Sequence, residues 1–199
     1  MAGPAIGSLP LELSWQPDPV SFEAGETSLR AEAGAKTDLF VDPGSGVEYL
    51  DAPRLLGPVA GDFTLAARVG VDFRSTFDAG VLLLFAHERA WAKLCHELSP
   101  EGKPTVVSVV TRGVSDDCNS SATDRNDVWL RIARLGAAFA FHASTDGTRW
   151  ELVRHFALDP GTELQVGFLV QSPLGEGCTA RFDEIAFAPV RLADIRSGD

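Results

Sequence analysis

Short segments in which apolar and polar residues alternate follow one another along most of the chain. The clearest runs from Phe63 to Phe73, where every odd position is apolar and the even positions include Thr64 and Arg68. A period of two residues predicts a β-strand with one buried face and one face in water. This segment therefore predicts a strand of an antiparallel sheet that covers a core.

Similar segments, bounded by glycine, proline or acidic residues, recur on both sides of this strand. No helical period is sustained for three turns, and residues 115–127 are expected to form an acidic loop. Because each sheet must bury its apolar face on another, the pattern predicts an all-β, two-sheet antiparallel β-sandwich or jelly roll. The expected strands cover residues 11–15, 29–33, 63–73, 80–85, 91–98, 104–111, 128–134, 137–143, 164–172 and 179–187. Residues 36–46 are expected to form a loop around a short run at residues 38–41.

The length of 199 residues is enough for one domain with a substantial core. The composition is too apolar, at 45 %, for a disordered chain. We expect residues 1–10 to form an N-terminal arm, residues 11–190 the sandwich and residues 191–199 a C-terminal tail.

Charge and cysteine content narrow the partners and the compartment. Seventeen Lys and Arg against 28 Asp and Glu give a net charge of -11, which disfavours nucleic acid and anionic membranes as partners. No apolar run approaches the ~20 residues of a membrane span, and no secretory signal is expected. Cys95, Cys118 and Cys178 are far apart and form no CxxC pair, so we expect no disulfide framework, no zinc site, no cofactor and a cytoplasmic location.

A series of short motifs stands in a fixed order from residue 61 to residue 173. They are Gly61–Thr64, Asp78–Leu82, Trp91–Glu97, Ser108–Thr111, Ser115–Asp116, Val128–Arg134, Ser144–Gly147 with Trp150, Val166–Gly167 and Gln171–Pro173. In order and spacing they resemble the bacterial and fungal regulation-of-enolase protein family, within the concanavalin A-like lectin/glucanase superfamily.

The resemblance covers roughly residues 13–188 and implies a concanavalin A-like jelly roll of two stacked sheets with one concave face. It implies no established activity. The chain departs from the family at Cys95, where a small residue is more common, and at Cys118, where an aromatic residue commonly follows the Ser-Asp pair. If that aromatic residue contacts a ligand, the second departure puts binding in doubt.

Strand alternation indicates which polar side chains leave the core for the concave face. If the strands that carry them are neighbours in register, one aromatic and polar surface results. Such a surface suits a carbohydrate or a sugar-derived metabolite, because aromatic rings stack on sugar C–H groups while polar groups bond the hydroxyls. The residues predicted for ligand binding are Trp91, Lys93, Glu97, Trp129, Arg131, His142 and Gln171.

Plainer interpretations of these residues stay open. Lys93, Glu97 and Arg131 could form ordinary ion pairs on a solvated sheet, and Trp91 could anchor the turn at residues 88–90. Cys95 could be a reactive thiol or apolar filler, whereas His96 alternates with buried neighbours and is expected in the core.

The leading functional hypothesis is therefore a non-catalytic binding module, and two alternatives remain. A glycoside-active enzyme would need two carboxyl groups, for which Glu97 and Asp183 are the candidates, although Lys93 is expected to hold Glu97 ionised. A regulatory module would use the sheet face to meet a protein partner, which the sequence does not identify.

The acidic segment 115–127 leaves a further choice open. Its Asp, Asn and Ser oxygens could gather around calcium, but the spacing fits no EF-hand, and a solvated acidic loop is the alternative. We assign no catalytic residue and no metal ligand from the sequence.

Overall fold

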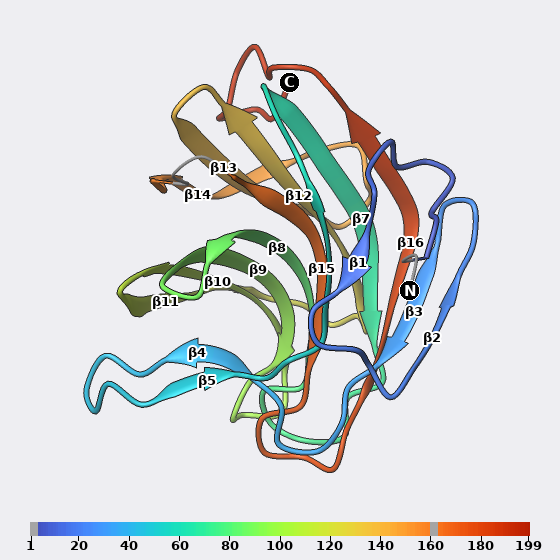
Figure 1. Ribbon diagram of the computed structural model, residues 1–199. Coiled ribbons are helices and arrows are strands. Elements are labelled where there is room, and N and C mark those ends of the chain that lie inside the picture. Colours follow the sequence, from blue (N-terminus) through green and yellow to red (C-terminus); the bar gives the residue numbers. More distant parts are fainter. Residues whose placement is uncertain (1–3, 160–162) are drawn as a thin grey trace.

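The computed structural model describes residues 4–159 and 163–199 and is a sandwich of two seven-stranded antiparallel sheets (Figure 1). This confirms the predicted fold class. None of the described residues lies in an α-helix, so they include no helix that could cross a membrane.

The first sheet contains the continuous apolar run at residues 80–85. Its spatial order is β1-β6-β15-β8-β9-β10-β11. The strands are β1 (Ser14–Trp15), β6 (Arg54–Pro58), β8 (Ala79–His87), β9 (Ala90–Leu98), β10 (Pro104–Arg112), β11 (Val114–Ala122) and β15 (Gln165–Gln171).

The second sheet packs against the first and has the order β14-β13-β12-β7-β16-β3-β2. Its strands are β2 (Ser21–Ala24), β3 (Leu29–Glu32), β7 (Phe63–Val71), β12 (Asp127–Leu135), β13 (Ala138–Ser144), β14 (Glu151–Ala157) and β16 (Thr179–Ala188). A separate two-stranded hairpin is made by β4 (Leu39–Val41) and β5 (Glu48–Leu50).

The core between the sheets follows the predicted alternation. The odd positions of β7 from Phe63 to Val71 are buried in it, and Phe168 meets Phe182 across the interface with ring centroids 4.9 Å apart. His96 is fully buried there, as predicted, with Nδ1 3.1 Å from the Val69 carbonyl oxygen. Burial lowers the pKa of His96 to about 4, so the imidazole is neutral in the core.

A second, smaller apolar cluster lies on the outer face of the first sheet. Leu39 and Val41 of β4 are fully buried against outward-facing residues such as Val81, Leu83 and Cys95. The hairpin therefore covers part of the face that alternation turns away from the core. This explains why residues 80–85 are uninterruptedly apolar, because the middle of the first sheet is buried on both faces.

The prediction of a loop at residues 115–127 is wrong for residues 115–122, which form most of edge strand β11. Main-chain bonding to β10 fixes the strand, with Val110 opposite Asp116 and Ser108 opposite Cys118. Most of its side chains are exposed, so no apolar alternation marks it. Segment 4–10 contributes Ile6 and Leu9 to the main core.

We expect Gly80→Ala to destabilise the fold by about 1–3 kcal/mol, because it overfills the contact between the sheets. A β-carbon at Gly80 would lie 2.7 Å from Val69 Cγ1 and 3.1 Å from Ala180 Cβ. Urea unfolding measures the change. The control is Gly34→Ala, whose nearest neighbour would be 3.6 Å away; equal stability of the two variants would show that the sheets are not this tightly packed.

Candidate functional site

A cavity of about 180 Å³ lies on the outer face of the first sheet, next to the β4–β5 hairpin. We call it the lysine cavity. It brings together charged, amide and apolar side chains from β4, β9, β10, β11, the C-terminal end of β15 and adjoining segments. It is lined by Asp38, Phe40, Phe77, Lys93, Glu97, Val107, Val109, Asp117, Gln171 and Pro173.

Lys93 is the central charge of this cavity, although its side chain is only 2 % exposed. Its Nζ donates to Gln171 Oε1 at 3.0 Å and lies 3.6 Å from Asp38 Oδ1. It also stands 6.0 Å from the centre of the Phe40 ring. A buried ammonium is stable only with such partners. Lys93 thus links β9 to Asp38, directly before β4, and to Gln171 at the end of β15.

The mouth of the cavity is fixed by a buried aspartate. Asp78 accepts hydrogen bonds from the backbone N–H groups of Arg74 and Ser75 and, at 2.6 Å, from the Ser172 hydroxyl. This network fixes the turn that presents Phe77, whose positive φ of 69° is rare for a residue with a bulky side chain. Gln171 Nε2 also donates to the Phe77 carbonyl at 3.4 Å.

Glu97 faces the same cavity but makes no hydrogen bond or ion pair with any described residue. Burial raises its pKa to about 7; Lys93 opposes this rise, and the carboxylates of Asp38 and Asp117 add to it. The expectation that Lys93 holds Glu97 ionised is therefore wrong. The ammonium is already used by Asp38 and Gln171, and burial outweighs its attraction for Glu97.

The strand register places Glu97 and Gln171 on either side of one residue. Ala79 of β8 pairs with Gln171 on one side and with Glu97 on the other. Ala79 itself is fully buried in the smaller apolar cluster.

Trp91 lies on the same strand but takes no part in the cavity. Its side chain is fully buried in the smaller apolar cluster, and Nε1 donates to the Glu88 carbonyl at 3.2 Å. The alternative of an anchor for the turn at residues 88–90 is thus confirmed. The ring has no exposed surface on which a sugar could stack.

The prediction that all seven residues share one surface is wrong. Trp129 and Arg131 are on β12 and His142 is on β13, which are neighbouring strands of the second sheet. Alternation correctly turns these side chains away from the core. They lie on the outer face of the second sheet, however, on the side of the sandwich opposite to the lysine cavity. Asp183 is also on the second sheet, where it lies 3.8 Å from Arg68, so it is not a partner for Glu97.

The C-terminal segment binds one nitrogen each of Arg131 and His142, whereas Arg131 Nε and His142 Nδ1 are buried without a hydrogen-bond partner among the described residues. Arg131 Nη2 donates to the Gly198 carbonyl at 2.6 Å, and its guanidinium lies 4.2 Å from the centre of the Trp150 ring. His142 Nε2 donates to the Ile195 carbonyl at 2.8 Å. Burial lowers the pKa of Arg131 to about 10 and that of His142 as well. Residues 195–198 thus cover both side chains.

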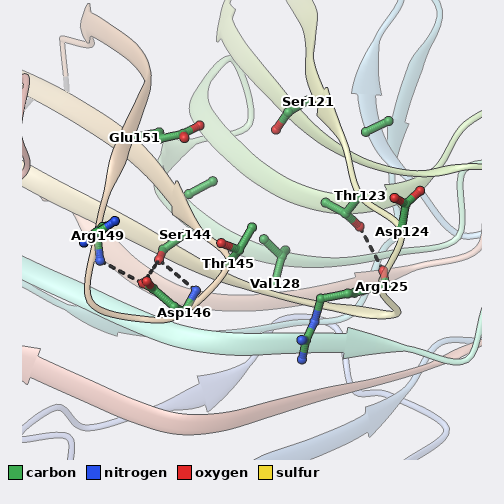
Figure 2. A pocket seen from close by; sticks show the side chains of 12 residues that line it. Ser121, Thr123, Asp124, Arg125, Val128, Ser144, Thr145, Asp146, Arg149 and Glu151 are labelled. Carbon is green, nitrogen blue, oxygen red and sulfur yellow. Dashed lines mark hydrogen bonds between the residues drawn. The ribbon is translucent and has the colours of Figure 1, made fainter.

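A larger, open cavity of about 560 Å³ lies where β11 and β12 meet the β13–β14 turn (Figure 2). We call it the edge cavity, and none of the seven predicted residues lines it. Asp146 accepts from the backbone N–H groups of Thr148 and Arg149, which lowers its pKa, and Ser144 binds the same turn. These polar groups therefore serve local turn structure.

The calcium alternative gains no support from the acidic segment. Asp116 forms an ion pair with Arg154 at 3.1 Å, and Asp127 pairs with Arg125 at 2.9 Å. Across residues 4–159 and 163–199, no three His, Cys, Asp or Glu side chains are grouped so as to hold a metal ion.

The reactive-thiol alternative also fails. Cys95 is fully buried in the smaller cluster, and burial raises the pKa of its thiol far above the ordinary value of 9.0. Cys95 is therefore apolar filler.

Sequence reasoning found three of the residues that line the lysine cavity, namely Lys93, Glu97 and Gln171. It missed the residues that approach from other segments. Their one signal is the alternation of the short strand 38–41, which separates Asp38 and Phe40 from the buried Leu39 and Val41. The missed residues are Asp38, Phe40, Phe77, Val107, Val109, Asp117 and Pro173.

A model of the family described as "Protein of unknown function (DUF1349)" matches residues 15–190. The chain belongs to this family. No curated protein matches it. The chain is similar in structure to a functionally unknown protein from Saccharomyces cerevisiae, with a TM-score of 0.82 and 24 % identity over 88 % of this chain and 95 % of the yeast one.

Other structures similar to this DUF1349 chain come from GH43 proteins. A mutant GH43 protein from Bacillus licheniformis gives a TM-score of 0.69 at 13 % identity, over 88 % of this chain and 36 % of that one. A xylan beta-1,4-xylosidase from Bacillus halodurans C-125 gives 0.66 at 14 %, over 80 % and 32 %. The chain thus spans about a third of each, and the likeness is one of fold.

We expect Glu97→Gln to become more stable relative to the unsubstituted protein as pH rises. The folded protein holds the Glu97 proton up to about pH 7, whereas the unfolded chain releases it near 4.5, so folding loses free energy between these values. The free energy of unfolding of Glu97→Gln, relative to that of the unsubstituted protein, should rise by about 1–2 kcal/mol between about pH 4.5 and 8, because solvent screening reduces the full effect. Urea unfolding at both pH values measures it.

The control for this experiment is Glu101→Gln, at an exposed turn position. Its stability relative to the unsubstituted protein should not change with pH. A Glu97→Gln variant that behaves like this control would show that Glu97 is not buried as described.

Proposed function

We propose that the lysine cavity binds one small polyhydroxylated ligand, a single sugar unit or a sugar-derived metabolite, without chemical change. The observation that carries this is a buried, paired ammonium in a cavity that also holds an unpaired carboxyl group and two aromatic rings. Donors and acceptors that converge from several strands on an apolar wall are typical of small-molecule sites.

The chemistry of the lining matches that of a sugar. Lys93 and the Gln171 amide supply donors, while Asp38, Glu97 and Asp117 supply acceptors for hydroxyl groups. The rings of Phe40 and Phe77 can pack against sugar C–H groups. They take the role that the sequence predicted for Trp91.

The size of the cavity limits the ligand. Its volume of about 180 Å³ is below the roughly 300–1,000 Å³ of pockets for drug-sized molecules. It therefore fits one ring better than an oligosaccharide. The GH43 structures that share the fold add support for a carbohydrate-related role, as likeness of fold alone.

A second candidate function is glycoside chemistry, because Glu97 is protonated near neutral pH while other carboxylates line the same cavity. Carboxyl groups with separated pKa values can act as acid and base. The small cavity favours binding, since a glycosidase must hold sugar on both sides of the scissile bond. Hydrolysis of chromogenic glycosides that Glu97→Gln abolishes would favour the enzyme.

Three further proposals concern the surroundings of the protein. We propose a cytoplasmic location, because Cys95, Cys118 and Cys178 are free thiols. We also propose membership of the regulation-of-enolase proteins, from the ordered sequence motifs and without any mechanism carried over. Nucleic acid and membrane are not proposed as partners, given the acidic composition.

Ligand-observed NMR with a panel of neutral monosaccharides tests the proposed function. We expect at least one to bind with a Kd of about 0.1–1 mM, a range that a few hydrogen bonds and one stacked ring can supply. Val109→Phe should abolish binding by filling the floor of the lysine cavity. Asp117→Asn, on exposed β11, should weaken it several-fold without risk to folding.

The matched control is Ala122→Phe, which fills the edge cavity instead. It should bind the monosaccharide as the unsubstituted protein does. Binding that is lost in Ala122→Phe but kept in Val109→Phe and Asp117→Asn would move the site to the edge cavity and contradict the proposal.

A further inference from the structure

We propose that the lysine cavity selects a ligand that carries a protonated amine, such as an amino sugar, over the corresponding neutral or acidic sugar. This inference rests on the proposed function and names the class of sugar. It follows from the excess of carboxyl groups around the cavity and from the pairing of Lys93 with Asp38 and Gln171.

The charged groups that face the cavity come from two strands and one adjoining segment. β9 supplies Lys93 and Glu97, β11 supplies Asp117, and Asp38 lies directly before β4. β10 contributes only Val107 and Val109, and β15 the uncharged Gln171. One ammonium thus stands against three carboxyl groups. The cavity has a deficit of positive charge whenever Glu97 is ionised.

The positive charge of the single ammonium is already balanced by Asp38. Lys93 Nζ is bonded to Gln171 Oε1 and paired with Asp38, and its side chain is almost fully buried. A ligand carboxylate would meet Glu97 and Asp117 without a free cation to bind it, which disfavours acidic sugars.

The Glu97 carboxyl group, which has no partner, would be stabilised by a cation bound in the cavity. Glu97 has neither hydrogen-bond donor nor ion pair among the described residues, and Asp117 of β11 has none either. A ligand ammonium beside Glu97 would give this carboxyl group a partner, and charge-assisted hydrogen bonds are about twice as strong as neutral ones. The rings of Phe40 and Phe77 offer additional attraction for a cation.

The overall charge and the lack of a metal-ligating cluster among the described residues also favour an organic cation as the ligand. A net charge of -11 raises the local concentration of cations. The described residues around the cavity do not form a group that could hold a metal ion, so an organic cation fits better. An amine on a compact hydroxylated ring meets the charge and the size requirements together.

Binding of such a ligand should release a proton. Glu97 holds a proton up to about pH 7, and an ammonium beside it favours the ionised form. At about pH 6.5 most Glu97 is protonated before binding and ionised after it. The measured binding enthalpy then depends on the ionisation enthalpy of the buffer.

The experiment is calorimetric titration of the full chain with glucosamine, glucose, glucuronate and cyclohexylamine at about pH 6.5, in two buffers of different ionisation enthalpy. We expect glucosamine to bind at least about tenfold more tightly than glucose, and glucuronate more weakly than glucose. Only the amine titrations should depend on buffer. Glu97→Gln should bring the glucosamine-to-glucose affinity ratio close to one, whereas Asp124→Asn, outside the cavity, should leave the ratio unchanged.

The outcomes separate this inference from the proposed function. Equal affinity for glucosamine and glucose would overturn the inference and leave sugar binding intact. Cyclohexylamine that binds as tightly as glucosamine would overturn the proposed recognition of hydroxyl groups and keep the charge preference. Binding of none of the four would overturn both.

Discussion

The burial of one ammonium group organises the functional side of this protein. Lys93 lies under the β4–β5 hairpin, where water cannot solvate it, so protein groups must replace the lost hydration. Asp38 and Gln171 do so, from a hairpin and from the end of β15. The ion pair thereby joins three segments that are distant in sequence, and the cavity is the space that remains between them.

The pairing of Lys93 with Asp38 and Gln171 also determines the chemistry of the lysine cavity. Because Asp38 and Gln171 use the ammonium, Glu97 is left in a partly buried position without a counterion. A carboxyl group in this situation keeps its proton to higher pH, and it gains most from a partner that brings positive charge. Function is proposed here from an unsatisfied group in a defined hollow rather than from the fold, which GH43 proteins and a yeast protein share at low identity.

The sequence predicted the local structure well and the assembly poorly, for a physical reason. Alternation in β9 separated Lys93 and Glu97 from the core-facing Leu94 and His96, because a pleated strand directs successive side chains to opposite faces. It could not tell that Arg131 belongs to the other sheet. Sheet membership depends on which strands pair, and that information lies in contacts between distant segments.

Two other features were beyond the sequence for similar reasons. Strand β11 owes its structure to main-chain bonds with β10, which leave no mark on its exposed polar side chains. The raised pKa of Glu97 depends on how deeply the fold buries its side chain, and the neighbouring Lys93 in the sequence suggests the opposite sign. The short run at residues 38–41 was visible inside a predicted loop, but not as part of the lining of a cavity.

The most direct test of this account is the titration of Glu97 itself, followed by the NMR shift of its side-chain carboxyl carbon. The account predicts a midpoint near pH 7, because Glu97 is buried beside a lysine that is already paired. A midpoint at or below the ordinary value of 4.5 would contradict it, since the carboxyl group would then be solvated or bound to the ammonium.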